Sequence, residues 1–364
     1  MATYYVNKSG NDSNDGLSEE NAKLTIGDAI TDATANGTGA PHTINIGDGT
    51  YSETVSATGT SNLADATIQG ASGDYSDVTI QGSATYQVSL GGGVKFKNIT
   101  VVNDAAAAGS AKYAIYSSTG ASTVTNCHLK SNNRGYYSVA AGSVIERCII
   151  ESTHKATTKA TWGVWWSAAN ASKIFSCLIL DWNHAIVYCY GGGDVVNCTA
   201  QTTHDKNTSL RGLYAANVYN SLCHNDGAAV RWGGITGTTD GENNVSWGWG
   251  SNDFRSNTSG ADNSDSGDVS SDGEQFVDED NDDFRLRPGT ISTTRGSYSY
   301  QTNNSVALLD LVGRPYDTST PSAGCYQYAW GASGGKKLAA TDRDVIGKIC
   351  GVSSTKVAKT MGQG

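Results

Sequence analysis

The chain has 364 residues, of which 44 are glycine, 4 are proline and only 16% are charged. This composition, with Val, Ile, Tyr and Trp among the apolar residues, favours an all-β protein with many tight turns over a helical or disordered chain. The net charge is −10, and the last 34 residues carry six Lys or Arg against two Asp, which leaves −14 on the body. That balance argues against nucleic-acid binding by the body.

The first residues predict a strand followed by a helix. The start, MATYYVNKSG, has no basic residues leading into an apolar run, so we expect no secretory signal. No segment is apolar over the roughly 18 residues that a membrane span requires. In LTIGDAITDA the apolar residues recur at near-helical spacing: Leu24, Ile26, Ala29, Ile30 and Ala33. We therefore expect residues 1–42 to form an initial strand and a short cap helix over the repeats that follow.

Residues 43–290 contain a repeat built on short apolar runs. The aligned positions, 28, 21, 29, 21 and 23 residues apart, are Ile99, Cys127, Cys148, Cys177, Cys198 and Ser221. A second strand precedes four of them by 12 residues, at Ile115, Tyr136, Trp165 and Ile186. Two strands and a variable loop per repeat, with no helix between them, predict an all-β, single-stranded parallel β-helix of about ten coils. Each strand then pairs with its equivalent one coil above and below.

The four aligned cysteines are expected to stack inside this narrow core. Thiols at such positions act as small apolar groups, which we favour over metal binding or redox chemistry because the chain has no zinc-type CxxC pair. The acidic run at Asp278–Asp283 offers oxygen ligands for Ca²⁺, but it lacks EF-hand spacing and also fits a solvated loop. We predict no metal site and no cofactor.

Insertions on a solenoid often gather on its functional face, and here two loops are long. They carry His154 and His204, 50 residues apart, and we expect both to project on the same side. The strand beside these loops alternates, so the residues after its inward positions should point outward: Tyr116, Tyr137, Trp166, Val187, Tyr214 and Arg231. Such an aromatic column has three interpretations, namely stacking on the sugar rings of a glycan, an oligomer interface, or packing under the loops.

Three carboxylates near this side are candidates for catalysis. They are Glu151 and Asp181, which follow aligned cysteines of consecutive coils, and Asp205 in the second long loop. Glycosidases need two carboxyl groups about 5–5.5 Å or about 6.5–9.5 Å apart, and adjacent coils satisfy either separation. The alternative is that all three are solvated turn residues.

Both ends of the body resemble a known superfamily. The opening YYVNKSGNDSNDGLSEENAKLTIGDAI, the coil INIGDGTYSETV and the closing NDDFRLRPGT, LVGRPYD and AGCYQY are similar to pectate-lyase-like right-handed β-helix proteins. The resemblance spans Thr3 to Tyr328 and implies a right-handed helix with a closing segment at 291–330. It implies no single activity, because the superfamily includes lyases, hydrolases, epimerases and inert virion proteins. The calcium-binding Asp cluster and basic residue of pectate lyases are not found.

Residues 331–364 form a Gly/Ser linker and a basic tail. The stretch KICGVSSTKVAKTMGQG resembles short segments near the ends of phage virion proteins, although a disordered basic tail also fits. We therefore predict a phage virion structural protein, a tail or decoration component assembled in host cytoplasm. Its expected partners are a host surface polysaccharide or other virion proteins, and we expect a homo-oligomer, with a trimer as one option, that neither binds nucleic acid nor enters a membrane. The alternative is a tailspike-type polysaccharide hydrolase or lyase.

Overall fold

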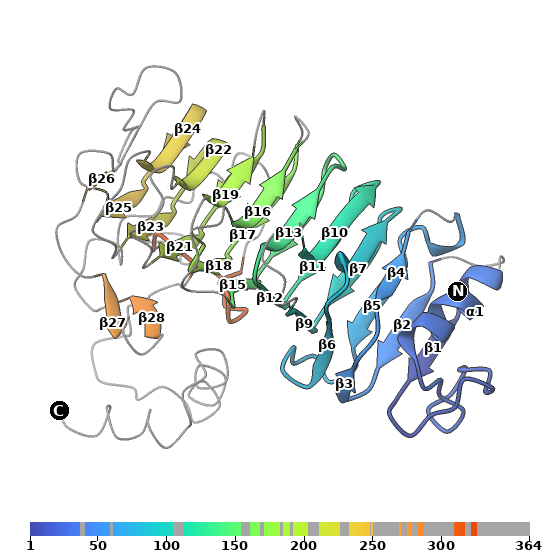
Figure 1. Cartoon of the computed structure of the whole chain (residues 1–364). Coiled ribbons are helices and arrows are strands. Elements are labelled where there is room, and N and C mark those ends of the chain that lie inside the picture. Colours follow the sequence, from blue (N-terminus) through green and yellow to red (C-terminus); the bar gives the residue numbers. More distant parts are fainter. Residues whose placement is uncertain are drawn as a thin grey trace, which may run out of the picture.

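The computed structural model describes residues 1–36, 41–58, 61–104, 112–153, 161–167, 171–182, 185–189, 192–202, 211–225, 233–247, 249, 269–270, 275–278, 283–286, 309–316 and 322–325. They form a parallel β-helix with three faces, and the chain passes from face 1 to face 2 to face 3 in each coil (Figure 1). The predicted fold class, an all-β parallel β-helix with a cap helix, is confirmed.

Faces 1 and 2 are each built from one short strand per coil. Face 1 contains β1 (Thr3–Val6), β2 (Thr43–Ile46), β5 (Thr67–Gly70), β8 (Lys95–Lys97), β11 (Thr123–Thr125), β14 (Val144–Glu146), β17 (Lys173–Phe175) and β20 (Asp194–Val196). Face 2 contains β3 (Gly49–Tyr51), β6 (Val78–Gly82), β9 (Thr100–Asn103), β12 (His128–Ser131), β15 (Ile149–Ser152), β18 (Leu178–Leu180), β21 (Thr199–Thr202), β23 (Leu222–Asn225), β25 (Val245–Trp247) and β26 (Val269–Ser270).

Face 3 completes each coil. It contains β4 (Val55–Ala57), β7 (Tyr86–Gly91), β10 (Tyr113–Thr119), β13 (Arg134–Ser138), β16 (Trp162–Trp166) and β19 (Ala185–Cys189). The longer β22 (Arg211–Tyr219) pairs with β19 at its start and with β20 at its end, so it runs from face 3 into face 1, and β24 (Gly233–Glu242) follows it in parallel. The coil count differs from the ten expected, because the first and last strands do not belong to complete three-stranded turns.

The aligned cysteines lie inside the helix at the corner between faces 1 and 2, as predicted. The thiols of Cys127, Cys148, Cys177 and Cys198 are fully buried. Each also donates a hydrogen bond to the carbonyl oxygen two residues earlier, at 3.2–3.4 Å, and the Ser221 hydroxyl does the same at 2.9 Å. The residue before each column member has a left-handed backbone, with φ between 49° and 60°, and is usually Asn, which tolerates this conformation. The same corner therefore recurs in successive coils, because each combines a left-handed residue with a small side chain, and the Cys and Ser side chains also donate a hydrogen bond.

The cap helix is α1 (Ile26–Ala35), and four of its apolar residues face the core. Leu24, expected on that face, is instead exposed, because it precedes the N-cap residue Thr25. Glu53, from the connection between β3 and β4, accepts hydrogen bonds from the backbone N–H groups of Ile26 and Gly27 at 3.0 and 2.9 Å. A carboxylate at this position satisfies free N–H groups and complements the helix dipole.

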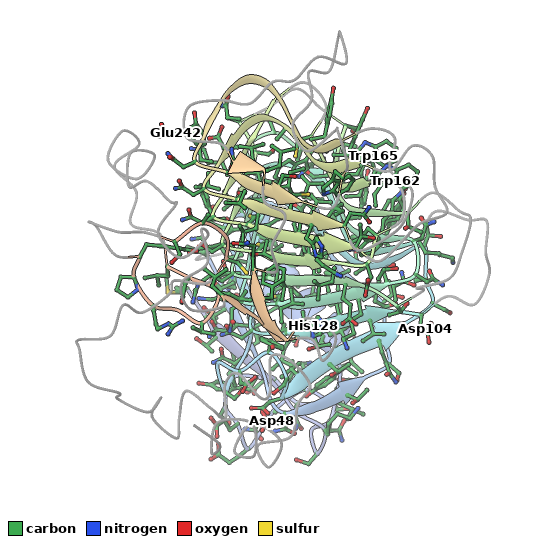
Figure 2. All side chains as sticks on the ribbon, turned by 90° about the vertical axis from the view of Figure 1, so that its left-hand side faces the viewer. Asp48, Asp104, His128, Trp162, Trp165 and Glu242 are labelled. Carbon is green, nitrogen blue, oxygen red and sulfur yellow. The ribbon has the colours of Figure 1, made fainter. Side chains whose placement is uncertain are left out.

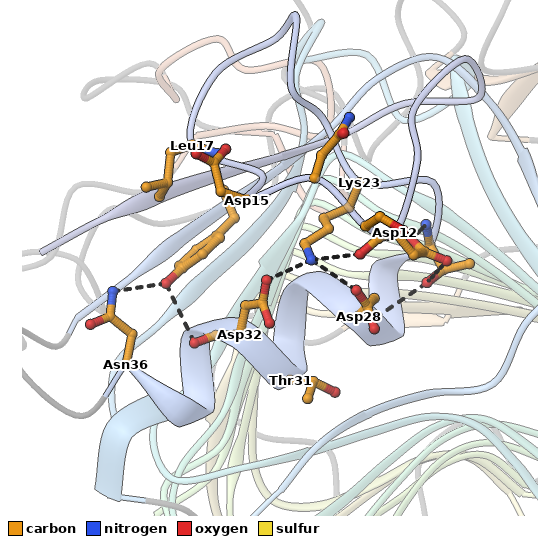
Figure 3. Close-up of polar contacts among 12 residues, drawn as sticks. Asp12, Asp15, Leu17, Lys23, Asp28, Thr31, Asp32 and Asn36 are labelled. Carbon is orange, nitrogen blue, oxygen red and sulfur yellow. Dashed lines mark hydrogen bonds and ion pairs between the residues drawn. The ribbon is translucent and has the colours of Figure 1, made fainter.

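A buried lysine fastens α1 to the N-terminal loop. Lys23 is 4% exposed, and its ammonium group lies 2.9 Å from Asp28 Oδ2 and 2.6 Å from Asp32 Oδ2 (Figure 3). The same group donates to the carbonyl oxygen of Asp12 at 2.9 Å. Burial lowers the pKa of Lys23, but the hydrogen bonds to Asp32 and Asp28 outweigh burial and raise the pKa above its ordinary value. The helix is thus held by charge pairs as well as by its apolar side.

The C-terminal part of the described chain folds back over the outside of the coils. The strands β27 (Phe276–Asp278) and β28 (Asp283–Leu286) form an antiparallel pair, so they lie outside the coil stack although they fall within the predicted 43–290 β-helix. Phe276 and Leu286, with Leu311, Ala323 and Cys325, pack against outward residues of face 2: Ile149, Leu178, Leu180, Leu222 and Val245. Face 2 is therefore covered over its later coils.

Candidate functional site

The outward side of face 3 carries the predicted aromatic residues. Tyr116 and Tyr137 lie level with one another in neighbouring strands and are half-buried, as expected. Their column continues through Trp165, Tyr188 and Tyr214. Tyr214 is in the predicted column but is only 4% exposed.

Two residues were wrongly predicted to point outward. Trp166 is 2% exposed and Val187 is fully buried, and the outward residues are their neighbours Trp165 and Tyr188. The turn from face 3 to face 1 is five residues long after β13, six after β16 and four after β19. Counting a constant 12 residues back from the cysteine is therefore wrong by one residue in β16 and β19. An error of one residue exchanges the inward and outward sides of a strand.

A second outward column, missed in the sequence, runs beside the first. It passes through Tyr86, Tyr113, Arg134 and Trp162 at the beginnings of their strands. We call the two columns together the aromatic ridge, whose members are Tyr86, Tyr113, Arg134, Trp162, Tyr116, Tyr137, Trp165 and Tyr188. In Figure 2, Trp162 and Trp165 lie together on one side of the stack, away from His128 of face 2 and from Glu242.

In four of these strands a small residue follows the first outward position, whereas β7 and β19 have Gln87 and Ile186 there. The segments YAIY, RGYY, WGVW and RGLY each place Ala or Gly second, followed by an inward side chain. A Cβ atom on Gly163 would lie 2.4 Å from the carbonyl oxygen of Ile186, and one on Gly212 would lie 2.0 Å from that of Gly234. Only glycine fits at these two positions, so the Gly-x-aromatic pattern was the signal available in the sequence.

The rings of the ridge stack on one another. Ring centroids are 4.3 Å apart for Tyr86 and Tyr116, 5.5 Å for Tyr116 and Tyr137, and 4.9 Å for Tyr137 and Trp165, with interplanar angles of 18°, 22° and 37°. Neighbouring rings thus cover part of each other's faces. Burial raises the pKa of Tyr113 and of Tyr116.

Arg134 is the cation within this aromatic surface. Its guanidinium carbon lies 4.2 Å from the ring centroid of Trp165, 4.6 Å from that of Trp162 and 4.8 Å from that of Tyr113. Its Nη1 donates to the Tyr113 hydroxyl, and its buried Nε has no hydrogen-bond partner within the part of the chain that the structure describes. Burial lowers the pKa of Arg134 from its ordinary value. The rings hold the guanidinium plane in place through cation–π contacts.

The carboxylate candidate Glu151 lies on face 2, not beside the ridge. It contacts His128 Nε2 at 3.0 Å and Lys130 Nζ at 3.4 Å. Burial raises the pKa of Glu151, but the hydrogen bond with His128 and the charge of Lys130 outweigh burial and lower the pKa to about 2. Burial also lowers the pKa of His128, and the ionised Glu151 carboxylate accepts the hydrogen bond from the imidazole. An acid that is already ionised cannot act as a general acid.

The other catalytic candidates are not assembled into a described pair. Asp181 is 5% exposed and has a left-handed backbone at the end of β18, one residue beyond the position level with Glu151. Asp205, His154, His204 and Arg231 lie outside the described residues. Within the described ranges, no group of three or more His, Cys, Asp or Glu side chains is arranged to hold a metal ion. In the same part of the chain, no helix is both long and apolar enough to cross a bilayer.

Comparisons with known proteins bear on the fold. No family model matches the chain, and no curated protein matches its sequence. The crystal structure of pectate lyase Pel9A matches with a TM-score of 0.56 and 16% identity, over 90% of this chain and 96% of that one. A pectin methylesterase from Aspergillus niger matches with a TM-score of 0.46 and 17% identity over 67% of this chain and 85% of that one, too low a score to carry an argument. The coil arrangement and the Pel9A match together show that the chain has the pectate-lyase-like right-handed parallel β-helix fold.

Proposed function

We propose that this chain is a structural component of a phage virion and that its aromatic ridge contacts a polysaccharide of the host surface. The observation that carries the proposal is the ridge itself, a line of aromatic rings, most of them half-buried, over successive strands of one face. Its hydroxyl and N–H edges match a polyhydroxylated chain, which needs hydrogen bonds at regular intervals.

The connections into face 3 favour the same surface. They vary from two residues between β12 and β13 to nine between β15 and β16. Changes of length are tolerated on a solenoid, and they often mark the side that binds a ligand. The ridge lies on the strands that these connections enter.

The virion part of the proposal is supported by the tail. Residues 348–364 resemble segments near the ends of phage virion proteins, as described above. The genes beside the coding sequence test this part, since capsid and tail genes are expected there. Neighbours with roles only in metabolism would contradict it.

Binding is tested with an array of purified bacterial capsule and O-antigen polysaccharides. We expect Tyr137→Ala and Trp165→Ala to lose at least about tenfold in affinity, because each removes edge contacts and disturbs the adjacent rings. The matched control is Tyr5→Ala, which removes a half-buried outward tyrosine from face 1. Equal losses in all three variants would contradict a site on the ridge.

The same variants distinguish a glycan surface from a subunit interface. Sedimentation of the wild type and of Trp165→Ala at equal concentration reports the oligomeric state. An unchanged mass together with lost glycan binding supports the proposal. If Trp165→Ala dissociates an oligomer while glycan binding persists, the ridge is an interface between copies.

A polysaccharide-degrading enzyme is the second candidate, favoured by the Pel9A match over nearly the full length of both chains. Similar fold does not carry activity across, and the described carboxylates do not form an acid and base pair on the ridge. Incubation of each retained polysaccharide with the protein, followed by an assay for new reducing ends, decides between the two. We expect no release, and sugar release that depends on Asp205 would establish the enzyme instead.

A further inference from the structure

Arg134 differs from the other arginines whose side chains the structure describes. Arg147 lies 3.6 Å from Glu146 and Arg314 lies 2.8 Å from Asp310, each measured between a guanidinium nitrogen and a carboxylate oxygen. Arg134 makes no ion pair with any described carboxylate, and its Nη2 has no hydrogen-bond partner among the described residues. A half-buried cation without a counter-ion costs free energy unless something else compensates it.

The stacked rings compensate only part of that charge. Tyr113 and Trp162 lie level with Arg134 in the strands before and after it, so the guanidinium plane is held between two aromatic side chains of the same column. Stacking uses the faces of the guanidinium group, Nε is buried and Nη1 donates to Tyr113, so Nη2 is the nitrogen left to donate to a ligand. A carboxylate or phosphate oxygen accepts a charge-assisted hydrogen bond from such a donor.

The strands beneath the ridge contain none of the acidic residues that are common elsewhere in the chain. The seven face 3 strands β4, β7, β10, β13, β16, β19 and β22 contain no Asp and no Glu, although the chain has 35 such residues and a net charge of −10. By backbone register Arg211 occupies the same column as Arg134, three strands further along. An anionic chain lying over this face would meet no carboxylate from the strands beneath it.

We infer that the ridge selects an anionic saccharide chain, and that Arg134 is the residue that binds the carboxylate or phosphate group of its repeating unit. The inference rests on the proposed glycan contact and specifies the ligand class. The neighbouring rings half-bury Arg134, and the lower local dielectric strengthens its attraction for an anion. The adjoining tyrosine hydroxyls then bind the sugar hydroxyls on either side of the acidic group.

The test uses the full chain on the same polysaccharide array, which holds acidic and neutral polymers. We expect the retained polymers to be acidic, and chemical reduction of their carboxyl groups to weaken binding at least about tenfold. Phosphate-bearing polymers retained despite carboxyl reduction would identify phosphate as the anion. Competition by inorganic phosphate and by acetate provides the same distinction in solution.

Three variants assign the selectivity to one residue. Arg134→Gln should abolish the preference for the acidic over the reduced polymer. Arg134→Lys should retain part of that preference, and the retained part should weaken with salt. Lys95→Gln, which removes an exposed charge from face 1, is the control and should leave the preference unchanged. Melting curves show whether each variant is folded. An equal loss for acidic and reduced polymers in Arg134→Gln would mean that Arg134 only supports the rings, and the inference would be wrong.

Failure of the inference can be separated from failure of the proposed function. If neutral and acidic polymers bind equally and binding still depends on Trp165, the ridge binds glycans without selecting charge. If no polymer on the array is retained, both the ligand class and the glycan contact are contradicted.

Discussion

At the scale of single residues, side chains that look alike in the sequence have different roles in the coils. The column of cysteines was predicted as a stack of small apolar groups, and their burial confirms this. The hydrogen bond from each thiol to the carbonyl two residues earlier explains why Ser221 continues the column. Serine keeps the donor and the small volume, whereas alanine would keep only the volume.

Glu151 gives a prediction for the pH dependence of stability. Its folded pKa of about 2 lies below the ordinary value of 4.5, so its stabilising contribution is fully present above about pH 4.5 and is lost as the pH falls towards 2. Glu151→Gln should lower the free energy of unfolding by about 1–2 kcal/mol at pH 7. Urea unfolding of both proteins should show the difference shrinking between pH 5 and pH 2.

Glu146 is the matched control for this experiment. It is a half-buried glutamate on the neighbouring strand, but burial raises its pKa above the ordinary value. Glu146→Gln should therefore leave stability at pH 7 nearly unchanged or raise it slightly. If Glu146→Gln and Glu151→Gln destabilise the protein equally, the contact with His128 contributes no specific stabilisation.

At the scale of elements, turn length determines which side of a strand faces outward. The positions of β10, β13, β16 and β19 were predicted correctly from the cysteine spacing, since the repeat fixes roughly where a strand lies. The direction of Trp165 and Trp166 was not, because one extra residue in the following turn exchanges their sides. The Gly-x-aromatic pattern contains the missing information, because close packing of Gly163 against the next coil aligns these strands.

The cap helix gives a prediction at this scale. Lys23→Met should lower the free energy of unfolding by about 2–3 kcal/mol, because it leaves Asp28 and Asp32 without their counter-charge. The raised pKa of Lys23 means that this stabilisation is present below about pH 10.5 and is lost as the pH rises further. Thermal unfolding at pH 7 and pH 11 measures both effects. Lys95→Met, at an exposed position on face 1, is the control and should have little effect at either pH.

At the scale of the whole molecule, the closing segment decides which faces are accessible. Leu311 and Cys325 cover outward apolar residues of face 2, and Tyr316 packs on Phe175 and Val196 at the adjoining part of face 1. The backbone N–H of Cys325 donates to the Thr199 hydroxyl at 3.0 Å, and that of Gly324 donates to the Asn220 carbonyl at 2.6 Å. Of the three faces, face 3 keeps the half-buried aromatic surface in the same coils.

Truncation tests this covering role. A chain ending at residue 308 should bind a hydrophobic dye, melt at a lower temperature and aggregate, because it exposes the apolar side chains of Leu178, Leu222 and Val245. A chain ending at residue 330 retains the segment and is the control. Equal melting temperatures for the two truncated chains would show that the segment contributes little to stability.

The sequence alone determined the repeat, the inward cysteines, the cap helix and therefore the fold class, because these depend on local spacing and on which residues tolerate a sharp turn. Tertiary structure decided which aromatic residues share the outer surface and where Glu151 lies relative to them. It also placed Arg134 between two rings and laid the closing segment on face 2. These features depend on the register between coils and on contacts between residues more than a hundred positions apart, such as Cys325 with Thr199. No local pattern specifies such contacts, because they form only once the coils are stacked.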